Sequence, residues 1–339
     1  MRIAVDAMGG DNAPQVVVEG AAQAARELNI EVMLVGDREQ VEAALPSWAA
    51  EHAHLIRIEH APDVVTMDEP GYSAAKRRDS SIARAVQLVK DGEAQAMVSA
   101  GNSAATVAAA TIILGRVEGT ERPGIATFYP TKRGTTVVCI DVGATVDCAP
   151  AQLVAFAIMG RSYAHKVLGI ANPRVGLLNI GEEPHKGTDT IRQAYSLLEK
   201  ANINFVGNVE GNHAFSGEVD VIVCDGFVGN VVLKCAEGMS ELVQSLIRRH
   251  MQSSLLYKLS GVLLKPLLKS VARSILYDEY GGAPLLGVNG ACVISHGRSN
   301  AKAIANAVRI AAETAKHGVV QDVASSLSAW VASSKPGDT

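Results

Sequence analysis

Residues 2–14 read RIAVDAMGGDNAP, an apolar run that ends abruptly in a polar turn rich in Gly, Asn and Asp. Four further stretches repeat this pattern, at residues 94–104 (AQAMVSAGNSA), 136–147 (TVVCIDVGATVD), 174–188 (RVGLLNIGEEPHKGT) and 219–234 (VDVIVCDGFVGNVVLK). In a parallel α/β sheet, ligands bind at the turns that follow the carboxyl ends of the strands. We therefore expect five such turns on one sheet edge. Their glycines and helix starts suit a phosphate-like oxyanion, because unpaired N–H groups can approach it closely.

Helix-like periodicity separates these turns. Apolar residues recur at helical spacing in segments 14–28, 80–91, 103–114, 152–167, 188–201 and 300–317. Ser80 and Ser81 are candidate caps of the second segment, and Gly318 is a stop signal after the last. This alternation predicts an α/β fold with a mostly parallel sheet and helices on both faces. Nothing marks a domain boundary, so we expect a single domain over residues 1–320 and a C-terminal tail over residues 321–339.

The segment 242–277 breaks this rhythm. It contains six Lys and Arg residues, many leucines and no acidic residue, which predicts a helical excursion near residues 240–280. One reading is a pair of core helices whose lysines reach outward. The other is a basic amphipathic element for a membrane surface or an acidic partner. The residues expected at that contact are Leu263, Leu264, Lys265, Leu267, Leu268, Lys269 and Arg273.

Composition excludes several classes of protein. The net charge of −4 lacks the basic footprint of a general nucleic-acid-binding protein, so no nucleic-acid partner is expected. The five cysteines are scattered and three lie in apolar runs, which is typical of reduced, buried thiols. No uninterrupted apolar stretch reaches the ~18 residues of a membrane span, and no signal peptide is evident. We expect a cytoplasmic protein.

Familiar catalytic motifs are missing. The sequence contains no G-x-G, H-E-x-x-H or G-x-S-x-G, so the usual dinucleotide, zinc-peptidase and esterase fingerprints are not present. The stretch GEEPHKGT resembles a phosphate-binding P-loop, but Lys186 precedes Gly187 instead of following it. The histidines form no cluster with ligand spacing, and we expect neither a metal nor a cofactor to be required.

The candidate functional residues are therefore chosen by position. Asn102 and Ser103 begin a helix directly after a strand, where an oxyanion could bind, although capping alone would explain them about as well. Lys186 could neutralise an anion. Asp225, Asn230 and Lys234 follow an apolar strand and could supply a base, a hydrogen-bond donor and a cation.

Several motifs together resemble the bacterial phosphate acyltransferases of phospholipid synthesis. These motifs are DAMGGDNAP (6–14), KRRDSS (76–81), SAGNS (99–103), DVGA (141–144), LLNIGEEPHKG (177–187), CDGFVGNVVLK (224–234), YGGAPLLGVNG (280–290) and HGRS (296–299). They occur in order as far as about residue 306. One departure is Thr145, where the family usually has Asn.

The resemblance implies an enzyme that moves a fatty acyl chain from acyl carrier protein to inorganic phosphate. The product is acyl phosphate, a precursor of phospholipids. It further implies a fold akin to phosphotransacetylase and the isocitrate and isopropylmalate dehydrogenases, a homodimer, and peripheral docking on the inner face of the membrane.

The reaction requires phosphate to attack a thioester carbonyl. An efficient site holds phosphate with N–H groups and cations and stabilises the tetrahedral oxyanion. We expect Gly9, Gly10, Asp11, Asn12, Asn102 and Ser103 to hold phosphate, with Asn230 also in the substrate site. Lys186 or Lys234 would be the counter-charge and Asp225 the proton acceptor. No nucleophile–base pair is evident, so a covalent acyl-enzyme is not demanded.

Three other functions compete with acyl transfer from acyl carrier protein to phosphate. A phosphotransacetylase acting on acetyl-CoA would not need the basic, leucine-rich excursion. An inert membrane scaffold would not need five polar turns. A dehydrogenase is disfavoured by the missing fingerprint, although dehydrogenases of this fold lack it too.

Overall fold

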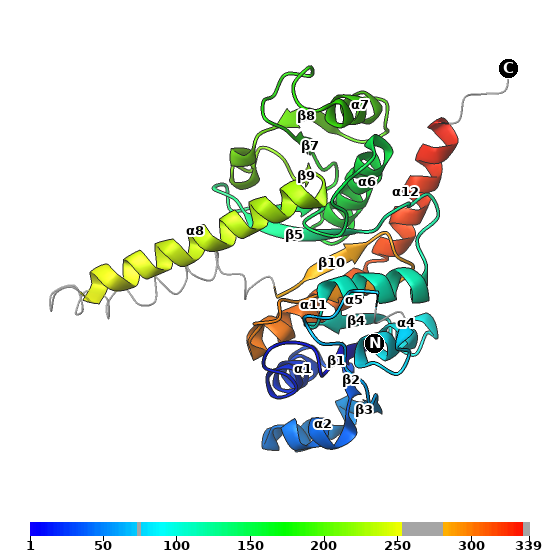
Figure 1. The fold of residues 1–339 in the computed structure, drawn as a ribbon, viewed down its shortest axis with the longest axis vertical. Helices are drawn as coiled ribbons and strands as arrows, with labels where there is room; N and C mark the ends of the chain where they lie inside the picture. Colours follow the sequence, from blue (N-terminus) through cyan, green and yellow to red (C-terminus); the bar gives the residue numbers. More distant parts are fainter. Residues whose placement is uncertain (73–75, 253–280, 335–339) are drawn as a thin grey trace.

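The strands form one sheet of eleven in the computed structural model, which describes residues 1–72, 76–252 and 281–334. They are β1 (Arg2–Asp6), β2 (Glu31–Gly36), β3 (Ile56–His60), β4 (Ala96–Ser99), β5 (Gly124–Pro130), β6 (Thr136–Ile140), β7 (Val175–Leu178), β8 (Phe205–Val209), β9 (Val221–Val223), β10 (Ala283–Leu286) and β11 (Ala291–Ile294). Their order is β3-β2-β1-β4-β11-β10-β5-β6-β9-β7-β8. Figure 1 shows helices packed around this sheet. The predicted α/β fold with a mostly parallel sheet is confirmed.

The sheet has two parallel halves that run in opposite directions. The first half contains β3, β2, β1, β4 and β11, and the second contains β6, β9, β7 and β8. Three antiparallel pairs, β11–β10, β10–β5 and β5–β6, separate them. The expectation of five turns on one edge is therefore wrong, because these three pairs reverse the strand direction between the halves.

Strand twist offsets this reversal. Neighbouring strands rotate relative to one another by roughly 20–25°. Six pairs separate β1 from β9 in the sheet order. The rotation accumulates to about 130°, so the carboxyl ends of the two halves turn toward a common region although their strands run oppositely.

The helices form layers on both faces of the sheet. They are α1 (Gln15–Leu28), α2 (Arg38–Ala44), α4 (Ser81–Lys90), α5 (Ser103–Ala109), α6 (Pro150–Lys166), α7 (Asp189–Leu198), α8 (Gly226–Gln252), α11 (Ala301–Lys316) and α12 (Val319–Ser334). The 3₁₀ helices η1 (Ser47–Leu55) and η3 (Gly211–Phe215) and the π-helical segment η2 (Ala110–Leu114) complete the set among the described residues. In the first half, α1 and α11 share one buried cluster, and α4 and α5 belong to another. In the second half, α6, α7 and α12 share a third.

Local signals explain several helix ends. Ser80 accepts a hydrogen bond from the Ala83 N–H at 3.3 Å, and Asn300 accepts one from Ala303 at 2.9 Å. These bonds satisfy N–H groups that the first helical turn leaves unpaired. Gly318 ends α11 with a positive φ of 64°, which glycine adopts without steric cost.

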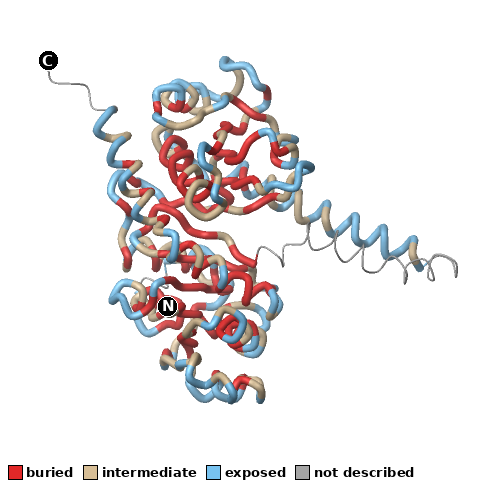
Figure 2. The backbone as a smooth tube through the Cα atoms, turned by 180° about the vertical axis from the view of Figure 1, so that it is seen from behind, coloured by how far each residue is buried: buried red, intermediate tan, exposed pale blue. Residues whose placement is uncertain are grey.

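The C-terminal helix α12 contains most of the segment expected as a tail. Val319, Val323 and Leu327 recur at a spacing of four and are buried in the cluster shared with α6. This apolar face packs residues 321–334 against the second half of the sheet. Exposed residues lie on the other side of α12 (Figure 2).

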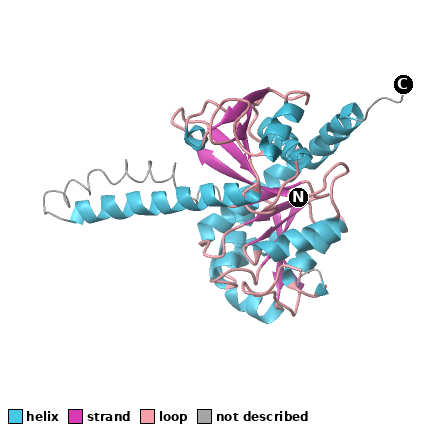
Figure 3. Ribbon diagram, turned by 45° about the horizontal axis from the view of Figure 1, so that its top comes forward, coloured by secondary structure: helices cyan, strands magenta, loops and turns pink. Residues whose placement is uncertain are grey.

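Helix α8 projects from the body of the molecule (Figures 1 and 3). Gly226 and Gly229 at its start are its buried residues, and the rest of the helix is partly or fully exposed. Residues 242–252 of the predicted excursion form its far end. Residues 253–277, with every residue expected at a membrane or partner contact, lie outside the described part of the chain.

Candidate functional site

The turn after β1 is built on a buried carboxylate. Asp6 is fully buried and accepts hydrogen bonds from the Ser99 hydroxyl at 2.7 Å and from the Met8 N–H at 3.2 Å. Burial raises the pKa of Asp6, although these donors act against the rise. Gly9 lies so close to the Asp6 carboxylate and Gly101 that a Cβ would overlap them. The backbone of this turn is therefore held tightly against the turn after β4.

The same turn also contacts the turn after β11. The Asp11 N–H donates to the Gly297 carbonyl at 2.8 Å. Gly10 has a φ of 112° and lies against the carbonyls of Gly297 and Ala100. Asp11 and Asn12 are exposed. The structure thus joins three turns of the first half, of which the sequence had singled out two.

A second buried carboxylate organises the turn after β6. Asp141 accepts N–H bonds from Ile125 (2.9 Å), Gly143 (3.1 Å), Ala144 (3.0 Å) and Thr145 (2.7 Å). Burial raises the pKa of Asp141 despite these donors. Thr145 also accepts a bond from the Gly226 N–H at 2.8 Å. These contacts of Thr145 use main-chain atoms, so they do not require the Asn that the resemblance predicts at this position.

Helix α8 begins directly against this turn. Gly229 lies where a Cβ would overlap the Asp141 carbonyl, so only glycine permits this close approach. Asp225 caps the helix by accepting from the Val228 N–H at 2.8 Å. A Cβ on Gly143 would lie 4.0 Å from the Cβ of Asn230. The turns after β6 and β9 therefore meet, because these two strands are parallel neighbours in the sheet.

Charged groups from the two halves meet around His296. This histidine follows β11 and is partly buried. Burial lowers its pKa, and so do the positive charges of Lys234 on α8 and Arg298, while Glu237 and Asp11 raise it. Lys234 itself pairs with Glu237 at 2.8 Å. The charges of Asp11 and Lys234, both predicted site residues, therefore both act on His296.

His296 and Arg298 were not among the predicted site residues. Their signal was available in the HGRS motif, which follows an apolar strand as the other polar turns do. The motif by itself is a weak site signal, because it is short and a lone histidine is commonly structural.

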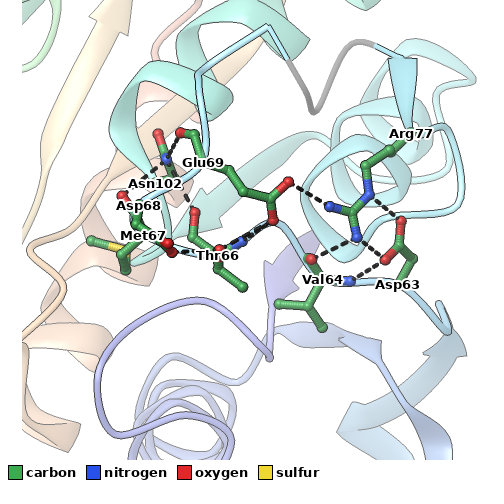
Figure 4. Close-up of polar contacts among 8 residues, drawn as sticks. All are labelled: Asp63, Val64, Thr66, Met67, Asp68, Glu69, Arg77 and Asn102. Atoms are coloured by element: carbon green, nitrogen blue, oxygen red, sulfur yellow. Dashed lines mark hydrogen bonds and ion pairs between the residues drawn. The ribbon is translucent and has the colours of Figure 1, made fainter.

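The side chain of Asn102 is occupied within the protein (Figure 4). Its Oδ1 accepts from the Ala105 N–H at 3.0 Å and caps α5. Its Nδ2 donates to the carbonyls of Thr66 (3.2 Å), Met67 (3.2 Å) and Glu69 (2.8 Å). This geometry gives Asn102 a positioning role and disfavours the predicted direct contact of its amide with phosphate. Ser103 beside it is exposed.

A salt-bridge network holds the other side of the same loop (Figure 4). Arg77 pairs with Asp63 and, at 2.7 Å, with Glu69, and it donates to the Val64 carbonyl at 2.9 Å. The hydrogen bond from Arg77 lowers the pKa of Asp63. A Cβ on Gly297 would lie 3.0 Å from Met67 Cε, in this loop, and 3.2 Å from Asp11 Oδ1. The loop after β3 therefore borders the site as well.

Lys186 lies in the loop after β7, which neighbours β9. Asn179 holds this loop by donating to the Lys186 carbonyl at 3.1 Å. Among the described residues, the Lys186 ammonium makes no ion pair with Asp225 or with any other carboxylate. Its proposed role as a counter-charge stays a prediction.

Two surface cavities lie elsewhere. One of about 450 Å³ is lined by α7, and one of about 400 Å³ lies between residues 119–121, α6 and α12. Neither is lined by a predicted site residue.

Within residues 1–72, 76–252 and 281–334, no group of three or more His, Cys, Asp or Glu side chains is arranged to hold a metal ion. In the same ranges, no helix combines the length and apolar character needed to cross a membrane.

Comparison with known proteins decides the family. Residues 1–322 match a family model described as a fatty acid synthesis protein. The phosphate acyltransferase of Pelotomaculum thermopropionicum is 49% identical over 328 residues, covering 96% of this chain and 95% of that protein. The phosphate acyltransferase of Geobacter sulfurreducens is 50% identical over 328 residues, covering 96% and 94%. The chain belongs to this family of phosphate acyltransferases.

The enzyme therefore transfers an acyl group to phosphate for phospholipid synthesis, as its motifs had indicated. Solved structures confirm the fold. A phosphotransacetylase from Streptococcus pyogenes matches with a TM-score of 0.63 at 19% identity, covering 93% of this chain and 94% of that one. A 4-hydroxythreonine-4-phosphate dehydrogenase from Klebsiella pneumoniae matches with a TM-score of 0.52 at 14% identity, covering 93% and 99%.

Proposed function

We propose that the enzyme takes a long-chain acyl group from acyl carrier protein and transfers it to inorganic phosphate where the turns of the two halves meet. The observation that carries this placement is the hydrogen bond from the Asp11 N–H to the Gly297 carbonyl at 2.8 Å, which sets the turn containing Arg298 beside the Asp11 turn. The charges of Lys234 and Arg298 also lower the pKa of His296 in that turn. Two cations beside a turn of closely packed glycines suit a doubly charged anion. The acyl donor follows from the family resemblance.

The reaction is an acyl transfer without oxidation or reduction, so the site has to stabilise the charges of phosphate and of the tetrahedral intermediate. An oxygen of hydrogen phosphate forms a bond to the thioester carbonyl carbon, whose π electrons move onto the carbonyl oxygen. The tetrahedral intermediate then collapses, the C–S bond breaks and its electron pair leaves on sulfur. The proton of hydrogen phosphate is released to a base and the thiolate is protonated, so acyl phosphate and a thiol result.

Named side chains divide this work in our proposal. Lys234 and Lys186 balance the phosphate charge, and Asp225 accepts the proton. The Gly9–Asn12 turn and Ser103 supply donors to phosphate, and Asn230 lines the acyl side. Asn102 acts by holding the loop after β3 in place.

Direct attack by phosphate is favoured over a cysteine acyl-enzyme. Cys148 lies near this region, and its thiol contacts the Thr145 carbonyl at 3.5 Å. Burial raises the pKa of Cys148 to about 12, and the neighbouring Asp141 and Asp225 charges add to the rise. A thiol with so high a pKa is almost wholly protonated at neutral pH and is a poor nucleophile.

We further propose that the enzyme is cytoplasmic, assembles as a homodimer and docks peripherally on the membrane. The exposed side of helix α8 supports a contact with a partner chain or with lipid. Its exposed face carries large apolar side chains, which are Met239, Leu242, Val243, Leu246 and Ile247. Such a surface favours a partner or a lipid interface. The basic residues after it in the sequence would add attraction to anionic lipid, at about 1 kcal/mol for each cation.

The decisive test of the reaction is product formation from two donors. Purified enzyme would be incubated with phosphate and either palmitoyl-acyl carrier protein or acetyl-CoA, and acyl phosphate would be trapped with hydroxylamine. We expect product from the first donor and little from the second. Efficient use of acetyl-CoA alone would support a phosphotransacetylase and overturn the proposal.

The excursion is tested separately by replacing Leu263 and Leu267 with Glu. This variant should no longer sediment with vesicles of anionic lipid, yet should still use soluble acyl carrier substrate. A matched variant, Lys265→Gln with Lys269→Gln, should lose part of its binding at low salt. Full vesicle binding by the Glu variant would assign the leucines to the core or the dimer interface.

A further inference from the structure

Turns at the ends of three neighbouring strands each expose a large apolar side chain. Val146 in the turn after β6 is 60% exposed, Ile180 in the turn after β7 is 80% exposed, and Phe227 at the start of α8, after β9, is 62% exposed. A single exposed apolar residue is ordinary on a protein surface. These three differ because β6, β9 and β7 are consecutive parallel strands, so their following turns lie at one edge of the sheet. Apolar side chains grouped in this way indicate a binding surface.

A main-chain hydrogen bond joins two of these turns. The Gly226 N–H donates to the Thr145 carbonyl at 2.8 Å, and a Cβ on Gly226 would lie 2.7 Å from that oxygen. Phe227 and Val146 are the next residues after this bonded pair. Both side chains stay mostly exposed where the two segments touch. The turn after β6 and the start of α8 therefore form one continuous surface.

Strand pairing places Ile180 at the same edge. Leu177 of β7 is the register partner of Val223 of β9. Ile180 follows Leu177 by three residues, and Phe227 follows Val223 by four. The two exposed side chains thus lie a similar distance along the chain beyond one paired position of neighbouring strands.

Helix α8 continues this surface toward the residues proposed for the reaction. Phe227, Val231 and Lys234 are spaced at four and then three residues, so they share one face of the helix. Val231 is 48% exposed, and Asn230 and Lys234 on the same side are also exposed. Asp225 caps the start of this helix. Apolar and polar groups of the site are therefore side by side on one element.

We propose that this surface, the apolar rim, holds the acyl chain of the donor and sets the preference for a long chain. The rim consists of Val146, Ile180, Phe227 and Val231. This role rests on the proposed function and adds the chain-binding part of the same site. The thioester carbonyl has to lie near Asp225 and Lys234 to react there, and the acyl chain extends from the carbonyl carbon. Apolar surface beside these residues removes methylenes from water, which raises affinity by roughly fourfold for each one fully buried.

An acyl chain suits the rim better than a protein partner does. Four side chains cover far less than the ~800 Å² that each partner buries in a typical stable interface. Asn230 and Lys234 share the helix face with the rim, so a second copy or a lipid surface seated there would cover groups proposed for the reaction. The exposed apolar residues farther along α8, from Met239 to Ile247, form a separate surface.

Two single substitutions test the rim without disturbing the core. Phe227→Ser and Ile180→Ser each remove an exposed apolar side chain from a different turn. Val206→Ser is the matched control, because Val206 is 47% exposed and lies near the amino end of β8, away from the turns that follow the strands. For each protein, kcat/KM would be measured with palmitoyl- and with butyryl-acyl carrier protein at saturating phosphate.

We expect the ratio of kcat/KM for the palmitoyl donor to that for the butyryl donor to fall by about tenfold in each rim variant, since each loses cover for about two methylenes. A merely structural loss would lower activity with both donors equally and leave this ratio as in wild type. Val206→Ser should keep the wild-type ratio. Sedimentation equilibrium and vesicle sedimentation of the rim variants should match wild type.

Contrary results overturn the proposal in distinct ways. A wild-type chain-length ratio in both rim variants would show that the acyl chain binds elsewhere. If that unchanged ratio came with a smaller sedimenting mass, the rim would be an interface between copies of the chain. If it came with lost binding to anionic vesicles, the rim would be a lipid contact. Failure of the wild-type enzyme to form acyl phosphate from palmitoyl-acyl carrier protein would instead reject the proposed function.

Discussion

Replacing Asn102 distinguishes a positioning role from direct contact with phosphate. In Asn102→Ala, the Ala105 N–H loses its cap, and the carbonyls of Thr66, Met67 and Glu69 lose their shared donor. A lost cap costs about 1 kcal/mol. The two N–H groups of the amide contribute about 1 kcal/mol each. The expected loss in the free energy of unfolding is therefore about 3 kcal/mol.

This loss corresponds to a measurable fall in melting temperature. For 339 residues, an unfolding entropy of roughly 2.1 cal/mol/K per residue gives about 0.7 kcal/mol/K. The melting temperature of Asn102→Ala should then drop by about 4 °C. Asn102→Asp keeps the cap acceptor but places a carboxylate against carbonyl oxygens, so it should be at least as unstable. Asn204→Ala is the control. It removes one hydrogen bond, from the Asn204 side-chain amide to the Asn172 carbonyl at 3.2 Å, and should lower the free energy of unfolding by about 1 kcal/mol or less.

Calorimetry measures the melting temperature of each variant, and steady-state kinetics measures its KM for phosphate and for the acyl donor. We expect both Asn102 variants to unfold earlier than wild type, and the KM for phosphate to rise no more than the KM for the acyl donor. A variant with the wild-type melting temperature and a selectively raised phosphate KM would refute this reasoning. It would restore the direct phosphate contact that the sequence had predicted.

Three other outcomes are expected. Lys186→Ala should lower kcat/KM for phosphate by roughly ten- to a hundredfold, because a charge-assisted bond is typically worth about 1.5–3 kcal/mol; unchanged phosphate kinetics would remove Lys186 from the site. Burial acts to raise the pKa of Asp220, but the donors of Arg174 hold it below the usual value. The pair should therefore stabilise the fold above about pH 4 and lose this contribution on further acidification. Arg174→Gln should cost on the order of 2 kcal/mol at pH 7 and less near pH 3 in urea unfolding, and an equal cost at both would contradict the assignment. EDTA should leave acyl phosphate formation unchanged, since phosphate attack needs only the charges of side chains and N–H groups; loss restored by a divalent ion would count against the mechanism.

The sequence was sufficient to locate several of the helices and strands. Apolar spacing predicted a strand over residues 94–99 and, with a serine cap beside it, a helix over residues 80–91, and the structure has β4 and α4 within these bounds. Such signals are local, because they depend on residues a few positions apart. The motifs likewise sufficed for the family, since their order along the chain is itself a sequence property.

Only the tertiary structure decided how the two halves of the sheet face each other. Strand direction depends on pairings such as Thr127 with Cys139 and Leu285 with Ile125, and no local pattern distinguishes these antiparallel pairs from parallel ones. The sequence likewise could not show where α12 lies, because its apolar face is buried only by packing against α6.

The site shows the same division. The sequence identified the segments that carry Asp11 and Lys234 but could not show that the charges of both act on His296, because that depends on how the two halves of the sheet are arranged. Nor could it show that the Asn102 amide is already used by carbonyls more than thirty residues away. Residue type and spacing determine which groups are available for chemistry, whereas long-range packing determines which of them meet and which are already bonded.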